Sequence, residues 1–250
     1  MLEKLFKLKQ NKTSLKQEAV AGLTTFLTMA YIIFVNPSML ADAGMDQGAV
    51  FVATCIAAAI GCLVMGLLAN YPIALAPGMG LNAFFTYTVV GEMGYSWETA
   101  LGAVFLSGIC FMILSLVRIR EWVVNSIPMS LRLGIAAGIG LFLALIGLKS
   151  AGIVVANPAT LVSMGDITAF PALMSVLGFF LIIAFVQRGY KAAVILSILA
   201  ITLLGLAFGD VQYTGLVSMP PSIAPTFMKM DLSGMLEISM ISVVFAFLFV

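Results

Sequence analysis

The chain has 250 residues, of which 62% are hydrophobic and 9% are charged, and its formal net charge is +1. Soluble globular domains carry about 25% charged residues, so this chain has too little polar surface to cover a water-soluble particle. With a mean hydropathy of +1.15, the composition predicts an integral membrane protein. It excludes intrinsic disorder, a disulfide scaffold, a coiled coil and a nucleic-acid-binding protein.

Residue counts narrow the chemistry further. The chain has no histidine, which excludes His-based triads, His metal sites and His proton relays. The three cysteines, Cys55, Cys62 and Cys110, lie in apolar runs without a C-x-x-C motif, so we expect small packing residues. Five lysines fall within the first sixteen positions. Because no small-x-small cleavage site follows them, residues 1–18 are predicted to form a basic cytoplasmic tail.

Apolar runs of the length that spans a membrane, about 20 residues, recur along the chain. The candidates are Ala19–Leu40, Ala49–Ala69, Glu98–Val117, Met129–Leu148, Leu173–Gln187, Ala192–Phe208 and a terminal run from Ile238. The terminal run stops within apolar residues, so residues 237–250 are expected to be the incomplete start of a span. We accordingly expect the 250 residues to be part of a longer protein.

One further stretch, Ala74–Val90, is apolar but contains Pro77, Gly78 and Gly80, which should break a continuous helix. Charge decides whether it crosses. If it does, ten Lys and Arg residues lie inside and two outside; if it does not, the split is seven to five. Because cytoplasmic loops are enriched in Lys and Arg, the stretch is predicted to cross. The fold class is therefore an all-α membrane protein with seven spans in residues 19–236, the third one broken, plus the start of an eighth.

A broken helix at membrane depth has a physical meaning. Irregular backbone survives there only where it faces protein or a wet cavity, and transporters place such half-helix ends at a substrate site. Residues 81–90 as helix would span about 15 Å, half of a ~30 Å hydrocarbon core. We expect an extended segment through Pro77, which biases Ala76 away from helix, followed by a short helix that starts near Gly80.

Asn82 lies in the first turn of that predicted half-helix. Its amide offers a donor and an acceptor to a ligand, or it caps the helix and satisfies the backbone. The surrounding sequence G-M-G-L-N-A also matches G-x-G-x-x-A, the fingerprint of dinucleotide-binding folds. Because a soluble βαβ unit and an acid about 20 residues on are both required, we do not expect nucleotide binding.

Aromatic and hydroxyl side chains lie close to the predicted break. Phe84, Phe85 and Tyr87 follow it, and they either stack on a flat heteroaromatic ligand or serve as packing and interface anchors. A polar stripe at i, i+4 and i+7 in the first span consists of Thr24, Thr28 and Tyr31. Such a stripe either bonds neighbouring helices together or lines a cavity.

Two runs carry a resemblance to a known family. AGLTTFLTMAYIIFVNP (21–37) and NYPIALAPGMGLNAFFTYTVV (70–90) resemble the first- and third-helix signatures of nucleobase–cation symporters in the xanthine/uracil permease superfamily. The similarity is to the azaguanine-permease-like branch, which handles adenine, guanine and hypoxanthine. It implies fourteen spans in two inverted seven-helix repeats, of which this chain would hold one. It also implies a substrate site between half-helices of the third and tenth spans.

The resemblance places Gly80 and Asn82 at positions implicated in purine binding and the Phe84 region at the adjoining wall. With Thr28 and Tyr31 from the polar stripe, these are the candidate substrate-binding residues. The acids that grip the purine and couple protons in the family lie on the eighth and tenth spans, beyond this sequence. We expect no catalytic residue, cofactor or metal.

The function implied is secondary active transport of purine nucleobases, with the proton as coupling ion. Implied with it are a multi-pass location in the cell membrane, a cytoplasmic N-terminus and the lipid bilayer as partner; a homodimer is left open. Two alternatives stay open: a sulfate-permease-type anion carrier, and a non-transporting membrane subunit if 250 residues is the true length. An intramembrane enzyme lacks the required nucleophile–base pair or metal cluster at membrane depth.

Overall fold

The computed structural model describes residues 6–116, 126–209, 211, 215, 218–232, 234 and 238–249. Arg118 and Arg120, which the charge count uses, and residues 235–237, where the eighth span is predicted to start, lie outside them. The chain divides into two compact units. Unit 1 comprises Met1–Val35, Phe51–Pro77 and Gly147–Pro221, and unit 2 comprises Asn36–Val50, Gly78–Ile146 and Ser222–Val250.

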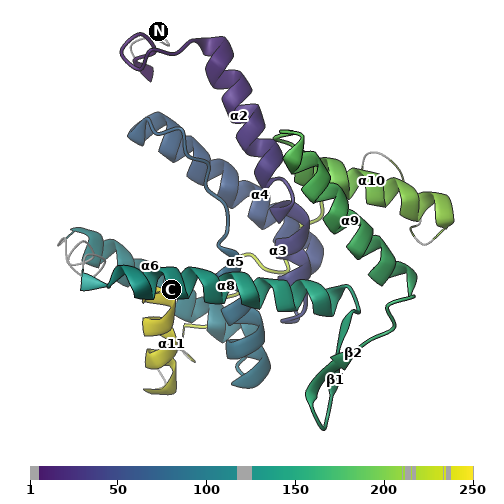
Figure 1. The fold of residues 1–250 in the computed structure, drawn as a ribbon. Helices are drawn as coiled ribbons and strands as arrows, with labels where there is room; N and C mark the ends of the chain where they lie inside the picture. The colour runs from purple at the N-terminus through teal and green to yellow at the C-terminus, as the bar shows by residue number, and fades with distance from the viewer. Residues whose placement is uncertain are drawn as a thin grey trace. The chain divides into compact units, whose positions relative to one another are not determined.

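The helices follow the predicted apolar runs (Figure 1). They are α2 (Leu15–Met29), α3 (Ile32–Ala41), α4 (Gln47–Val64), α6 (Trp97–Leu116), α8 (Met129–Ser150), α9 (Phe170–Gln187), α10 (Ala193–Phe208) and α11 (Ile238–Phe249). In the part of the chain that the structure describes, five helical stretches are long and apolar enough to cross a membrane, and α10 is a shorter apolar helix. A mostly helical membrane fold is thereby confirmed, whereas the count of seven spans stays a prediction.

The first predicted span is two helices rather than one. Helix α2 ends at Met29, and α3 begins at Ile32. Between them the carbonyl of Tyr31 accepts the backbone N–H groups of Phe34 and Val35, at 3.0 and 3.1 Å. Pro37 lies inside α3, and because it has no backbone N–H it cannot donate a hydrogen bond within this helix. The stretch from Leu15 to Ala41 is still long enough to span a bilayer.

A short β-hairpin between α8 and α9 is the one addition, in the part of the chain that the structure describes, to the predicted helical fold (Figure 1). Strands β1 (Val154–Asn157) and β2 (Leu161–Met164) pair antiparallel. Asn157 forms the turn, because its side-chain oxygen accepts the N–H groups of Ala159 and Thr160 at 2.8 and 3.3 Å, as Asn does in short turns. Strands of four residues are too short to be recognised as apolar runs of about 20 residues.

The turn that leads from this hairpin to α9 is held by Asp166. Its carboxylate accepts the hydroxyl of Thr168 at 2.5 Å and the Thr168 N–H at 2.9 Å. Both hydrogen bonds favour the charged form, and they lower the pKa of Asp166, the hydroxyl contributing most. The carboxylate therefore stays ionised to lower pH than an isolated Asp side chain.

In unit 2 a face of small residues meets a face of large ones. The buried residues of α6 are Thr99, Ala100, Gly102, Ala103 and Ser107. The buried apolar residues of α11 recur at i, i+3, i+4 and i+7, and they are Met240, Val243, Val244 and Phe247. The two helices pack together, since small residues let helix backbones approach closely in membranes. The two alanines of α6 and the four apolar residues of α11 belong to the core of the unit, together with Phe85 and Val89.

In unit 1, α9 packs against α10, and α10 also contacts α2. The first of these contacts depends on Gly178, where an added Cβ would lie 3.2 Å from Cγ1 of Ile201. That distance is shorter than ordinary van der Waals contact, so even alanine would force Ile201 to move. A glycine at this position therefore sets the close spacing of α9 and α10 (Figure 1).

Asp46 is the N-cap of α4, and we predict that Asp46→Ala lowers the stability of the protein. The Asp46 carboxylate accepts the backbone N–H of Ala49 at 2.7 Å, and losing such a cap costs about 1 kcal/mol. The melting temperature of the purified protein should fall by about 2 °C. Asp46→Asn keeps the capping oxygen and should melt like the wild type, and equal loss in both variants would contradict the capping role.

Candidate functional site

The third predicted span is broken as expected. The π-helical turn η1 (Met65–Ala69) extends α4 and ends at Asn70, which has left-handed backbone angles of φ 52° and ψ 39°. Asn tolerates this conformation better than most residues. The chain then runs without helix or strand through Tyr71–Gly78. Helix α5 (Met79–Ala83) follows, and it continues as the π-helix η2 (Phe84–Glu92).

The prediction of an extended segment followed by a helix that starts near Gly80 is therefore confirmed. Two prolines explain the extended part: Pro72 and Pro77 fix φ and lack an N–H. Helix α5 starts at Met79 with Gly78 as its N-cap, and Gly78 provides no side-chain bond. The helical part is longer than the ten residues predicted, because η2 carries it to Glu92.

The Asn82 side chain pairs with another asparagine in unit 2. The Asn82 side-chain N–H₂ donates to the side-chain oxygen of Asn36, which lies in α3. Asn36 is only 3% exposed, so the pair ties the first-span segment to the half-helix in a setting where an unpaired amide is costly. The side chain of Asn82 thus does not cap α5, and its carbonyl oxygen and second N–H remain for another partner.

Gly80 is the second residue of α5, two positions after the N-cap Gly78, and it faces α8. An added Cβ at Gly80 would lie 3.7 Å from Cγ2 of Ile139, which is ordinary van der Waals contact. Gly80 therefore leaves room for a small side chain. The structure brings Gly80 and Asn82 together on α5, in agreement with their shared motif.

The aromatic residues after the break have partners within unit 2. Phe84 packs edge-on against Phe247 of α11, with ring centroids 5.2 Å apart and planes at 77°. Phe85 is buried in the core, and the hydroxyl of Tyr87 donates to the carboxylate of Asp42 at 2.8 Å. Packing is thus the observed role of the Phe84 ring.

Thr28 and Tyr31 belong to unit 1, whereas the other three candidate residues belong to unit 2. The hydroxyl of Thr28 donates to the carbonyl of Thr25 in its own helix at 2.7 Å. Thr24 bonds to Val20 in the same way at 2.8 Å. These two hydroxyls satisfy the backbone of α2 and do not join it to another helix.

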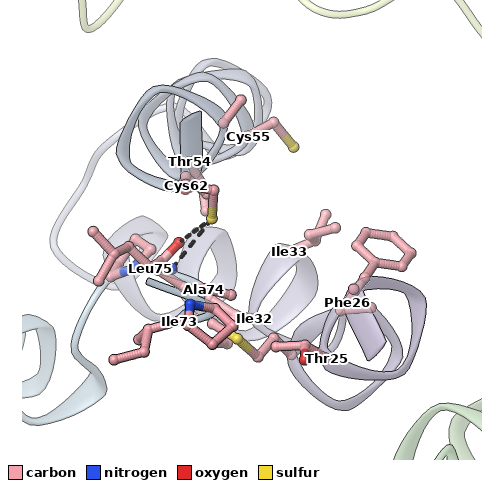
Figure 2. Close-up of a pocket in the computed structure, with 18 of the residues that line it drawn as sticks. Thr25, Phe26, Ile32, Ile33, Thr54, Cys55, Cys62, Ile73, Ala74 and Leu75 are labelled. Carbon is pink, nitrogen blue, oxygen red and sulfur yellow. Dashed lines mark hydrogen bonds between the residues drawn. The ribbon is translucent and has the colours of Figure 1, made fainter. Parts of the chain in front are cut away.

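A cavity of about 550 Å³ lies within unit 1. Its walls are α2, α4 and the unwound segment 71–77 (Figure 2). Polar side chains on these walls include Thr25, Thr54 and Cys62, and the remaining lining is mainly apolar. Volume and lining match those of small-molecule sites, which are typically about 300–1,000 Å³ and largely apolar with few polar groups.

Sequence reasoning missed Asn36, Thr25 and Cys62. Asn36 stands next to Pro37 in an otherwise apolar span, and a buried amide at such a place signals a partner. Thr25 lies one residue from the predicted stripe, and it is Thr25 that lines the cavity. The sequence predicts only a packing role for Cys62. Its spacing of i, i+7 from Cys55, which places both cysteines on one face of α4, was the available signal.

Comparisons with known proteins identify the family. Residues 16–250 match the permease family. The chain is 50% identical to the adenine permease AdeP of Escherichia coli, 53% identical to the putative permease MJ0326 of Methanocaldococcus jannaschii and 44% identical to the guanine/hypoxanthine permease PbuG of Bacillus subtilis. All of this chain is covered in each case, against 56%, 57% and 59% of those relatives.

The chain thus spans a little more than half the length of these relatives. All three are named as permeases rather than as enzymes. The matched region contains the unwound segment Tyr71–Gly78 and the long apolar helices described above. The chain therefore belongs to the xanthine/uracil permease family, in its purine branch, as a multi-pass membrane protein.

Proposed function

We propose that the complete protein transports purine nucleobases such as adenine, guanine and hypoxanthine across the cell membrane. The observation that carries this proposal is that the whole of this chain matches part of relatives named adenine permease and guanine/hypoxanthine permease. The broken third span supports it, because discontinuous helices mark substrate sites in transporters. The N-terminus is cytoplasmic in this proposal, and the proton is the coupling ion.

Asn82 is the residue of this chain best suited to bind the base. Its side chain is fixed on one side by Asn36, which leaves an acceptor oxygen and one donor hydrogen. Purine bases present N–H donors and ring-nitrogen acceptors along their edges, so an amide can match them. Gly80 lies on the same short helix, and Phe84 begins the π-helix η2 that continues it.

Asn82→Ala should abolish or severely weaken purine uptake by the complete gene product while leaving its abundance in the membrane largely intact. A lost hydrogen bond to a buried polar group costs about 1–3 kcal/mol, which corresponds to roughly a tenfold to hundredfold loss in affinity. Uptake of labelled hypoxanthine, adenine and guanine, and their binding to purified protein, provide the measurements.

Asn157→Ala in the β-hairpin is the matched control, because it removes an asparagine that shapes only a turn, and it should transport normally. Wild-type affinity of Asn82→Ala for all three bases would place the site elsewhere. Uptake of sulfate instead of purines by the wild type would favour the anion-carrier alternative and contradict the proposed substrate.

Asn36 and Asn82 should behave as a coupled pair in a double-mutant cycle. Because each single alanine variant already removes the hydrogen bond between the two amides, the double variant should lose less stability than the two single losses predict. Pairs in contact show coupling energies of about 0.5–3 kcal/mol. Thermal unfolding of the four proteins measures this energy, and simple additivity would show that the pair does not stabilise the fold.

The topology is tested by cysteine labelling. Met93→Cys, in the loop between the third and fourth spans, should react with an impermeant maleimide from outside the cell, and Ser126→Cys should react only from inside. The background would carry Cys55→Ala, Cys110→Ala and Cys62→Ser. Met93 is preferable to Ser96, since the Ser96 hydroxyl accepts the N–H of Thr99 at the start of α6. Labelling of both positions from one side would refute the predicted crossing of Ala74–Val90.

A further inference from the structure

The unwound segment 71–78 must find hydrogen-bond partners outside a helix or a sheet. Within a membrane, each unsatisfied backbone group is costly because no water is available to replace the partner. At the middle of this segment, the N–H of Leu75 donates to Sγ of Cys62 at 3.2 Å, and the thiol of Cys62 lies 3.4 Å from the carbonyl of Leu75, to which it donates (Figure 2).

One side chain therefore satisfies both backbone groups of one residue. In an antiparallel β-sheet, a hydrogen-bonded pair of residues exchanges two bonds in the same way. Here the thiol of α4 replaces the second strand, since it can accept one bond and donate the other. The close approach depends on the preceding residue, Gly61, because an added Cβ there would lie 3.3 Å from Cβ of Leu75.

Four hydroxyl groups elsewhere in the helices bond within their own helix instead. They donate to carbonyl groups of their own helix four residues earlier, as in Thr25 to Ala21, Ser175 to Pro171, Ser197 to Ala193 and Thr202 to Ile198, at distances of 2.8–3.0 Å. A thiol is a weaker donor. The bond of Cys62 to Leu75 instead crosses from α4 to the unwound segment.

We propose that Cys62 is a positioning residue for purine binding: its thiol anchors Leu75 and thereby fixes residues 71–77 of the unwound segment. The proposal rests on the proposed function, since it assigns the anchor to that transport. The anchored residues also form part of the wall of the 550 Å³ cavity, so the shape of this cavity depends on the same two bonds. Cys62 acts through the backbone and is not itself assigned a contact with the base.

The test measures hydrogen–deuterium exchange of the backbone and affinity for the ligand separately, both in the complete gene product. In Cys62→Ala the Leu75 N–H loses its acceptor, so hydrogen–deuterium exchange at the Leu75 amide should become about tenfold faster, and the Kd for hypoxanthine should rise by about the same factor. Cys62→Ser retains an oxygen that can accept this N–H even when its own proton goes to the helix, and it should restore slow exchange and most of the affinity.

Cys110→Ala is the matched control, because Cys110 is a free cysteine in helix α6 and does not line the cavity. It should leave both the exchange rate and the affinity unchanged. Unchanged exchange at Leu75 in Cys62→Ala would refute the anchor, and faster exchange with wild-type affinity would refute its role in purine binding. If the wild type bound no purine, the proposed function would fail, while the exchange rates would still decide on the anchor.

Discussion

The need to satisfy backbone hydrogen bonds without water governs the predicted third span and its surroundings. A continuous helix would meet this need within itself, but Pro72 and Pro77 prevent one. The chain resolves the conflict locally: Asn70 turns the backbone in the left-handed region, and Cys62 bonds both backbone groups of Leu75. Each solution depends on the residue type: asparagine tolerates a positive φ, and a thiol can both donate and accept a hydrogen bond.

The paired asparagines show how a buried polar group can be both stable and available. Asn36 is almost fully buried and would be costly alone, yet its bond to Asn82 uses only one of the two N–H groups that Asn82 carries. The remaining polar atoms are held in a fixed orientation. A ligand that binds there has less side-chain entropy to remove, which is the general advantage of preorganised sites.

Hydropathy and charge predicted most of the fold, because membrane spans are long and their signal is averaged over about 20 residues. The break was also predictable, since Pro77 and the glycines near it act through local sterics. The Tyr31 interruption and the β-hairpin were not predicted, because each occupies a few residues within or between spans. The pairing of Asn36 with Asn82 could not be derived either. It depends on two segments 46 positions apart, and periodicity within one helix contains no information about such a contact.

The packing of α6 on α11 has a consequence for how this family can vary. Because the buried face of α6 consists of alanine, glycine, serine and threonine and that of α11 of methionine, valine and phenylalanine, the volume of one face is set by the other. A methyl group gained on α6 can be accommodated only by a methyl group lost on α11, since filled interiors resist extra volume. Side-chain sizes at these positions should therefore covary inversely among the relatives, and such compensation would be visible in an alignment even where no residue is invariant.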